Sequence, residues 1–168
     1  MIEEHQKYMD AALQEAEKAL EAGEFPVGCV LVHNGRIVAT GGRENSGPDG
    51  NEFDHAEIVA MRNLLNENPS LDFSEVVVYS TLEPCLMCFS TLILNGFRTI
   101  VYGYEDVMGG GSKLELSRLP SLYAAMEVKV IPGVRRAECL ELFQHFFKND
   151  DNDYWRNSLL SNYTLEQT

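Results

Sequence analysis

The chain has few basic side chains: 13 lysines and arginines stand against 26 aspartates and glutamates in 168 residues, giving a formal net charge of −13. Proteins bind nucleic acids largely by neutralising phosphates with Lys and Arg. A net negative charge opposes that binding over a Debye length, even where a local basic groove exists. The composition therefore favours a small, uncharged substrate over a polynucleotide.

The sequence also lacks long apolar runs and a set of cysteines spaced for disulfide bonds. No run approaches the ~18 residues that a membrane-spanning helix needs, and residues 1–4 do not resemble the start of a secretory signal. Of the four cysteines, Cys85 and Cys88 form a C-x-x-C motif, whereas Cys29 and Cys139 are isolated in apolar surroundings. This usage fits a reduced compartment with one metal site better than a disulfide framework. We therefore expect a cytoplasmic protein with no membrane partner.

The length and the 45% hydrophobic content fit one globular domain over 1–168. Apolar periodicity and turn signals predict the elements along the chain. The expected helices are 2–23, a segment from His55, a segment carrying both motif cysteines, 135–148 and a short one at 154–160. The expected strands are 25–32 and 36–40, joined by an Asn34-Gly35 turn, then 76–80, 99–103 and 127–131. This order predicts an α/β architecture, a sheet covered by helices.

Two short motifs carry the chemistry. His55-Ala56-Glu57 begins a predicted helix, and Pro84-Cys85-Leu86-Met87-Cys88 begins another. One imidazole and two thiolates are ligands that zinc prefers, and three protein ligands leave a fourth position for water, as in catalytic zinc sites. The dipoles of both helix N-termini would favour the thiolate state. His55, Cys85 and Cys88 are therefore the expected ligands of one catalytic zinc.

Glu57 lies two residues after the histidine, inside the expected site but poorly placed as a further ligand. A carboxylate there can move a proton from the zinc-bound water to a ring nitrogen and a leaving amine. Without this transfer, zinc-bound hydroxide would have to expel a very basic amide anion. The pattern thus predicts Glu57 as the proton shuttle of a hydrolytic deamination.

Other uses of these residues remain open. A lone C-x-x-C motif is also typical of a redox pair or of half a structural zinc site. A structural site needs a fourth Cys or His nearby, and His5, His33 and His145 have no ligand spacing. A thioredoxin-like motif would follow a tryptophan near the chain start, which is not the case here. Together with H-x-E, the motif favours catalytic zinc.

Two loop residues before the histidine have alternative interpretations. Asn45 lies in the predicted loop 41–53, where its side chain either reaches the hydrogen-bonding edge of a substrate ring or only caps a turn. Asp54 immediately precedes His55, and we interpret it as the N-cap of that helix rather than as a substrate contact.

These motifs, with Pro26-Val27-Gly28 and the Asn34-Gly35 hairpin, resemble the cytidine-deaminase-like superfamily. The similarity runs through most of residues 5–148 and is strongest to the branch of tRNA adenosine deaminases, fungal-type cytosine deaminases and guanine deaminases. It implies a three-layer α/β/α fold with a central five-stranded mixed sheet. It also implies a zinc-dependent hydrolase that deaminates a cyclic amidine, a homodimer, and Asn45 as the substrate-binding asparagine.

The C-terminal extension distinguishes the branches. The tRNA enzymes typically end in a basic helix that grips the anticodon stem, whereas residues 149–153 of this chain are Asn-Asp-Asp-Asn-Asp. Cytosine deaminases end in a short acidic helix with an aromatic residue over the base, to which Asp153-Tyr154-Trp155 is similar. The resemblance thus implies that 149–168 covers the site and that Tyr154 and Trp155 contact substrate, although core packing is the commoner role for aromatic residues.

Charge and extension together favour a nucleobase or nucleoside, cytosine-like or purine, as the substrate. The loop at 104–120, by contrast, is longer and more like that of purine-acting members. The first alternative, with tRNA as partner, is deamination of adenosine to inosine at the wobble position. A second alternative is a catalytically silent, zinc-bearing partner subunit; such subunits usually lack the shuttle carboxylate, which is present here as Glu57.

Overall fold

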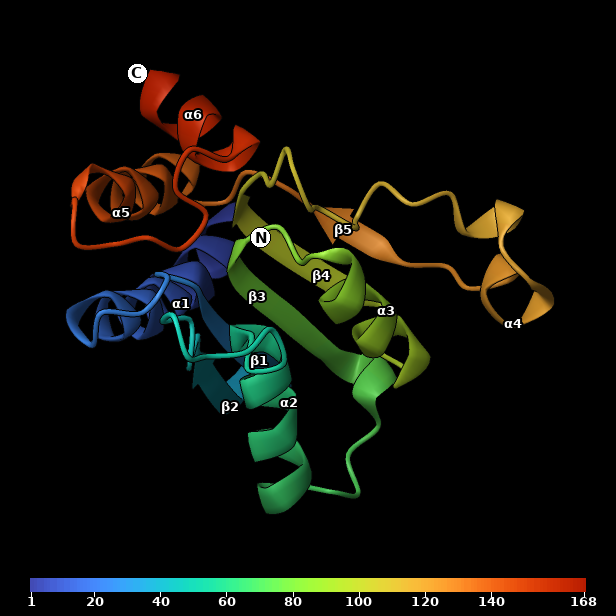
Figure 1. Ribbon diagram of the computed structural model, residues 1–168. Helices are drawn as coiled ribbons and strands as arrows, with labels where there is room; N and C mark the ends of the chain where they lie inside the picture. Colours follow the sequence, from blue (N-terminus) through green and yellow to red (C-terminus); the bar gives the residue numbers. More distant parts are fainter.

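A computed structural model describes residues 1–168 and contains a five-stranded sheet in the order β2-β1-β3-β4-β5 (Figure 1). The strands are β1 (Gly28–His33), β2 (Arg36–Gly42), β3 (Val76–Leu82), β4 (Thr99–Tyr104) and β5 (Lys129–Ile131). The α-helices are α1 (Ile2–Glu21), α2 (Ala56–Glu67), α3 (Leu86–Leu94), α4 (Ser121–Ala124), α5 (Arg136–Lys148) and α6 (Leu159–Glu166). Two 3-10 turns, Phe73–Glu75 and Leu116–Arg118, complete the list.

The sheet is mixed. β1 pairs antiparallel with β2 and with β3, whereas β3, β4 and β5 run parallel to one another. α1 and α5 cover one face, and α2 and α3 cover the other (Figure 1). The expected three-layer α/β/α fold with a five-stranded mixed sheet is therefore confirmed. The β1–β2 hairpin turns at Asn34 and Gly35, both with positive φ (49° and 74°), as the sequence predicts.

A glycine on β2 sets the position of α2. A Cβ atom on Gly41 would lie 2.5 Å from the carbonyl oxygen of Ala56 and 2.5 Å from the amide nitrogen of Ala60. Only a residue without a side chain allows this close approach of helix to strand. His55, at the start of α2, is thereby held against the sheet.

Two local predictions are wrong. Residues 154–160 do not form a helix; they include a turn in which Trp155 and Asn157 have left-handed φ values of 55° and 59°, and α6 starts only at Leu159. L-residues with positive φ cannot continue a right-handed helix. Ser158 caps α6 instead, its hydroxyl accepting a hydrogen bond from the Ser161 amide at 3.1 Å.

The predicted N-cap of α2 is also corrected. His55 itself occupies the N-cap position, and the Asp54 carboxylate accepts hydrogen bonds from the side chains of Asn45 (2.9 Å) and Asn51 (2.8 Å). Asp54 therefore ties the loop together rather than capping the helix. As for membranes, no helix of the structure has the length and apolar character needed to cross one.

Candidate metal centre and active site

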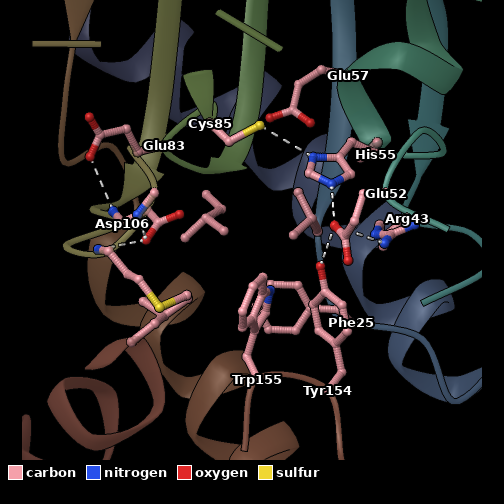
Figure 2. Close-up of a pocket in the computed structure, with 16 residues that line it drawn as sticks. Phe25, Arg43, Glu52, His55, Glu57, Glu83, Cys85, Asp106, Tyr154 and Trp155 are labelled. Atoms are coloured by element: carbon pink, nitrogen blue, oxygen red, sulfur yellow. Dashed lines mark hydrogen bonds and ion pairs between the residues drawn. The ribbon is translucent and has the colours of Figure 1, made fainter. Parts of the chain in front are cut away.

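Three side chains meet where two helices begin. His55 and Cys85 are the N-cap residues of α2 and α3, and Cys88 lies one turn into α3. Their ligand atoms all lie within 4.8 Å of one another. The imidazole Nδ1 of His55 is 3.5 Å from the Sγ atom of Cys85 (Figure 2). The same nitrogen is 3.5 Å from the Sγ atom of Cys88. The fold thus brings the three predicted ligands together from positions 30 residues apart in sequence.

The spacing of the ligand atoms fits zinc. A tetrahedral zinc with Zn–N of about 2.1 Å and Zn–S of about 2.3 Å places nitrogen and sulfur roughly 3.6 Å apart. The two observed distances of 3.5 Å match this value. No fourth protein ligand joins the cluster. The triad therefore fits one catalytic zinc with a position left for a further ligand.

The thiols and the imidazole are electrostatically coupled. A hydrogen bond from Cys88 and another with His55 outweigh burial and lower the pKa of Cys85 to about 4. The same sulfur–sulfur hydrogen bond and burial raise the pKa of Cys88. Burial lowers the pKa of His55, but hydrogen bonds to Cys85 and Glu52 outweigh it and raise that pKa to about 9. Cys85 is therefore already a thiolate at neutral pH, the form that binds a metal cation.

Glu57 lies beside the triad in the first turn of α2 and is 3% exposed. Its Oε1 accepts a hydrogen bond from the Ser80 hydroxyl at 3.1 Å, which fixes the carboxylate. Burial, with the nearby Cys85 thiolate, raises the pKa of Glu57 above its ordinary value. A carboxyl group with a raised pKa is suited to both accepting and returning a proton.

A cavity that is partly open to solvent leads to the triad. Figure 2 shows His55, Glu57 and Cys85 at one end, with Tyr154 and Trp155 at the other. The tail thus supplies a wall opposite the metal site. Trp155 is 45% exposed, so its ring is not simply a core residue.

Asn45 lies elsewhere. It is exposed, has φ of 53°, and does not line this cavity; its side-chain amide donates to Asp54 at 2.9 Å. The loop geometry thus shows the turn-stabilising contact that was one of the two interpretations of this residue. A substrate role for Asn45 stays a prediction.

Several lining residues carry no sequence signal. Among them are Phe25, Arg43, Glu52 and Asp106. Glu83 is 3% exposed and accepts hydrogen bonds from the Ser112 hydroxyl (2.5 Å) and the Asp106 amide (3.1 Å). These bonds hold the loop that contains Gly109-Gly110-Gly111 against the start of α3. Burial raises the pKa of Asp106. Its loop is brought to the cavity only by tertiary contacts, so no local motif could reveal it.

Comparison with known proteins agrees with the site. Residues 2–104, more than half of the chain, match the family described as the cytidine and deoxycytidylate deaminase zinc-binding region. The chain belongs to this family. It is therefore a zinc-binding deaminase, a hydrolase that acts on a carbon–nitrogen bond. The predicted family is confirmed, and with it zinc as the cofactor.

Similar members of this deaminase family include tRNA-specific enzymes. The chain is 36% identical over 159 residues to tRNA-specific adenosine deaminase 2 of Xenopus tropicalis, covering 90% of this chain and 93% of the relative. It is 30% identical over 148 residues to the tRNA-specific adenosine deaminase of Streptococcus pyogenes serotype M18, covering 88% and 92%. A solved structure from work on A-to-I editing by tRNA:A34 deaminases superimposes with a TM-score of 0.70 at 30% identity, covering 81% and 98%.

Proposed function

We propose that the chain is a hydrolytic deaminase that converts adenosine to inosine at the wobble position of a tRNA, with Glu57 as its proton shuttle. The similarity to tRNA-specific adenosine deaminases over about nine-tenths of both chains carries the choice of substrate. It outweighs the charge argument, because a net charge of −13 describes the whole surface rather than the rim of one cavity.

The chemistry follows from the position of each side chain. His55, Cys85 and Cys88 would hold a zinc ion, which would act as a Lewis acid and lower the pKa of a bound water to about 7. Glu57, held by Ser80, takes a proton from the attacking water and delivers it to the ring nitrogen. It then passes the second proton to the amine, which leaves as ammonia while the ring carbon gains a carbonyl oxygen.

A free nucleobase or nucleoside is the second candidate substrate. Tyr154 and Trp155 form a wall of the cavity, which supports a site closed over one small ring. The stretch 149–153 is acidic, where a polynucleotide would prefer basic groups. In this case the predicted contacts of Trp155, Tyr154 and Asn45 with substrate would concern the base alone.

The two candidates differ in a direct assay. Zinc-loaded protein is incubated with tRNA carrying A34, and in parallel with cytosine, guanine, adenine and their nucleosides. Inosine in the tRNA supports the first candidate, and ammonia only from small molecules supports the second. No product from either set, with one zinc per chain, would favour the silent partner subunit.

Replacing the shuttle tests the mechanism. Glu57→Gln keeps the shape of the side chain but cannot cycle a proton, so turnover should fall by ~10²–10⁴-fold. Zinc content, read by atomic absorption, should stay at one per chain. Glu44→Gln, an exposed glutamate of the same region, is the matched control and should keep full activity. An active Glu57→Gln enzyme would refute the shuttle role.

We further infer that the chain forms a homodimer. Exposed apolar side chains on the α2 and α3 helices support this assembly: Leu65, Leu86 and Leu94 are 48%, 55% and 55% exposed. Sedimentation at micromolar concentration tests it, and a single species at monomer mass, 18.9 kDa, would count against it.

A further inference from the structure

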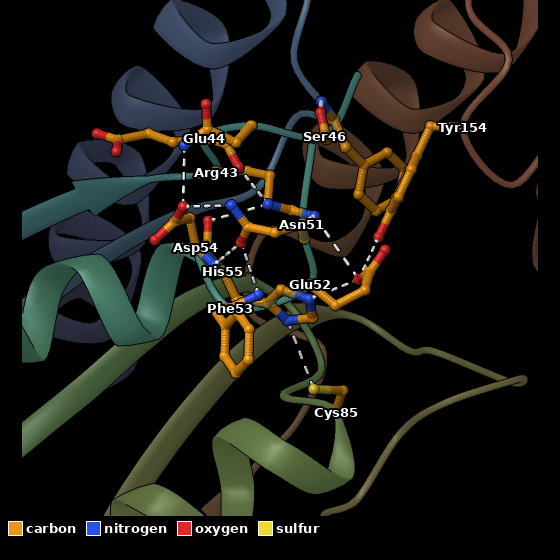
Figure 3. Close-up of polar contacts among 12 residues, drawn as sticks. Arg43, Glu44, Ser46, Asn51, Glu52, Phe53, Asp54, His55, Cys85 and Tyr154 are labelled. Atoms are coloured by element: carbon orange, nitrogen blue, oxygen red, sulfur yellow. Dashed lines mark hydrogen bonds and ion pairs between the residues drawn. The ribbon is translucent and has the colours of Figure 1, made fainter. Parts of the chain in front are cut away.

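One carboxylate oxygen joins the metal site to the C-terminal tail. The Oε2 atom of Glu52 lies 3.0 Å from the Nε2 atom of His55 and accepts a hydrogen bond from the Tyr154 hydroxyl at 2.9 Å (Figure 3). The Arg43 guanidinium is 3.6 Å from the same oxygen. Glu52 and Tyr154 are 102 residues apart in sequence.

The contact with His55 bears on zinc. Because Nε2 is turned to Glu52, Nδ1 faces both sulfur atoms. A metal-binding histidine commonly donates its second N–H to a carboxylate, which fixes the ring orientation and strengthens the ligand. Removing such a partner typically weakens metal affinity ~10–100-fold.

The contact with Tyr154 bears on the tail. The Tyr154 ring packs at 5.1 Å from the Phe25 ring and 5.5 Å from Trp155, and the Arg43 guanidinium lies 5.5 Å from its centroid. Arg43 is itself fixed, because its side chain is 2% exposed and donates to the backbone carbonyls of Asn51 (2.8 Å) and Asp54 (3.2 Å). Tyr154 therefore contacts both members of the Arg43–Glu52 ion pair, and the arginine of that pair is held in place by the backbone.

The turn at the tail needs such an anchor. Trp155 and Asn157 hold left-handed backbone angles, which cost energy for residues with a side chain. Strained conformations persist only where surrounding contacts impose them. Tyr154 precedes Trp155, and its hydrogen bond to Glu52 connects this turn to His55 of the metal site.

We propose that Glu52 is a positioning residue that couples the two: it orients His55 for zinc, and through Tyr154 it links zinc binding to the seating of Trp155 over the cavity. The proposal rests on the zinc site alone and is independent of which substrate the enzyme uses.

Zinc affinity, measured by competition with a chromogenic chelator, tests the first half. Glu52→Ala should weaken zinc binding ~10–100-fold. Glu52→Gln keeps an oxygen that accepts the N–H of His55, so its loss should be smaller. Glu44→Gln, at an exposed site, should bind as the parent protein does. Circular dichroism of the zinc-free proteins checks that each is folded. Parent-like affinity in a folded Glu52→Ala variant would overturn the proposal.

A double-mutant comparison tests the link to the tail. Tyr154→Phe removes one hydrogen bond and should weaken zinc binding about 2- to 10-fold, whereas Tyr123→Phe on α4 should not. If Tyr154 acts through Glu52, the Glu52→Ala/Tyr154→Phe protein should bind zinc as Glu52→Ala alone does. Additive losses would mean that Tyr154 acts by another route.

Trp155 is the only tryptophan of the chain and reports on the tail directly. Zinc should reduce acrylamide quenching of its fluorescence in the parent protein and have no such effect in Glu52→Ala. Equal quenching with and without zinc in the parent would overturn the coupling. Because none of these measurements uses turnover, a failure here is distinct from a failure of the proposed reaction.

Discussion

The two ends of the cavity are built in different ways. At the metal end, His55, Cys85 and Cys88 stand at the starts of α2 and α3, which the sheet holds in place. At the other end, Tyr154 and Trp155 belong to a turn between α5 and α6 that is secured by side-chain contacts. The ligands of the metal end therefore rest on regular secondary structure, whereas the wall at the other end rests on side-chain contacts of a single turn.

The largest effect is expected from breaking the metal end. Cys88→Ala removes one of three ligands and should abolish zinc retention on dialysis. At a zinc concentration of 1,000 times Kd, binding stabilises the parent protein by ~4 kcal/mol. This zinc-dependent rise in melting temperature should disappear in the variant.

A second buried cysteine supplies the control. Cys139 is fully buried on α5, away from the triad. Cys139→Ala should lower stability through lost packing but keep one zinc per chain and its stabilising effect. If Cys88→Ala retained zinc as tightly as Cys139→Ala, the triad would not be the metal site.

A smaller effect is expected from breaking the tail end. Trp155→Ala removes a ring that lines the cavity, and stacking of an aromatic side chain on a base contributes ~1–3 kcal/mol. KM should rise roughly 5- to 150-fold while zinc content stays unchanged. Leu159→Ala, an apolar residue that is 60% exposed and outside the cavity lining, should behave as the parent protein does. An unchanged KM would mean that Trp155 does not contact the substrate.

The same division explains what the sequence could predict. The zinc ligands follow from spacing, because Cys85 and Cys88 are one helical turn apart and His55 opens the other helix. The Asn34-Gly35 turn is equally local. Glu52, by contrast, reaches His55 and Tyr154 only after its loop folds back through Asn51 and Asp54.

The errors have the same origin. The apolar pattern of 154–160 predicts a helix, but the long-range contacts of Tyr154 hold the turn and postpone the helix to Leu159. Asp54 is a good N-cap residue by type, yet Asn45 and Asn51 compete for its carboxylate. Side-chain contacts outside the predicted helix overrode its local preference in both places.

The smallest effect on stability is expected from the contacts that attach α6, which follows the turn containing Trp155, to the rest of the fold. Glu105, directly after β4, pairs with Arg136 of α5 at 2.5 Å and accepts a hydrogen bond from Tyr163 of α6 at 2.8 Å. Burial raises the pKa of Glu105, but the hydrogen bonds from Arg136 and Tyr163 outweigh it and lower that pKa below its ordinary value. The pair is partly exposed, so its contribution should be below about 1 kcal/mol.

The sign of the pH dependence follows from this shift. A carboxylate with a lowered folded-state pKa stabilises the fold above its unfolded pKa of about 4.3, and this stability is lost as the pH falls through the folded value. Glu105→Gln should therefore be less stable than the parent at pH 7 and equal to it near pH 2, measured by urea unfolding of zinc-free proteins. Glu115→Gln, from an exposed pair with Arg118, should show no difference at either pH. An equal deficit of Glu105→Gln at both pH values would mean that packing, not charge, attaches α6, and that the tail is held by its turn alone.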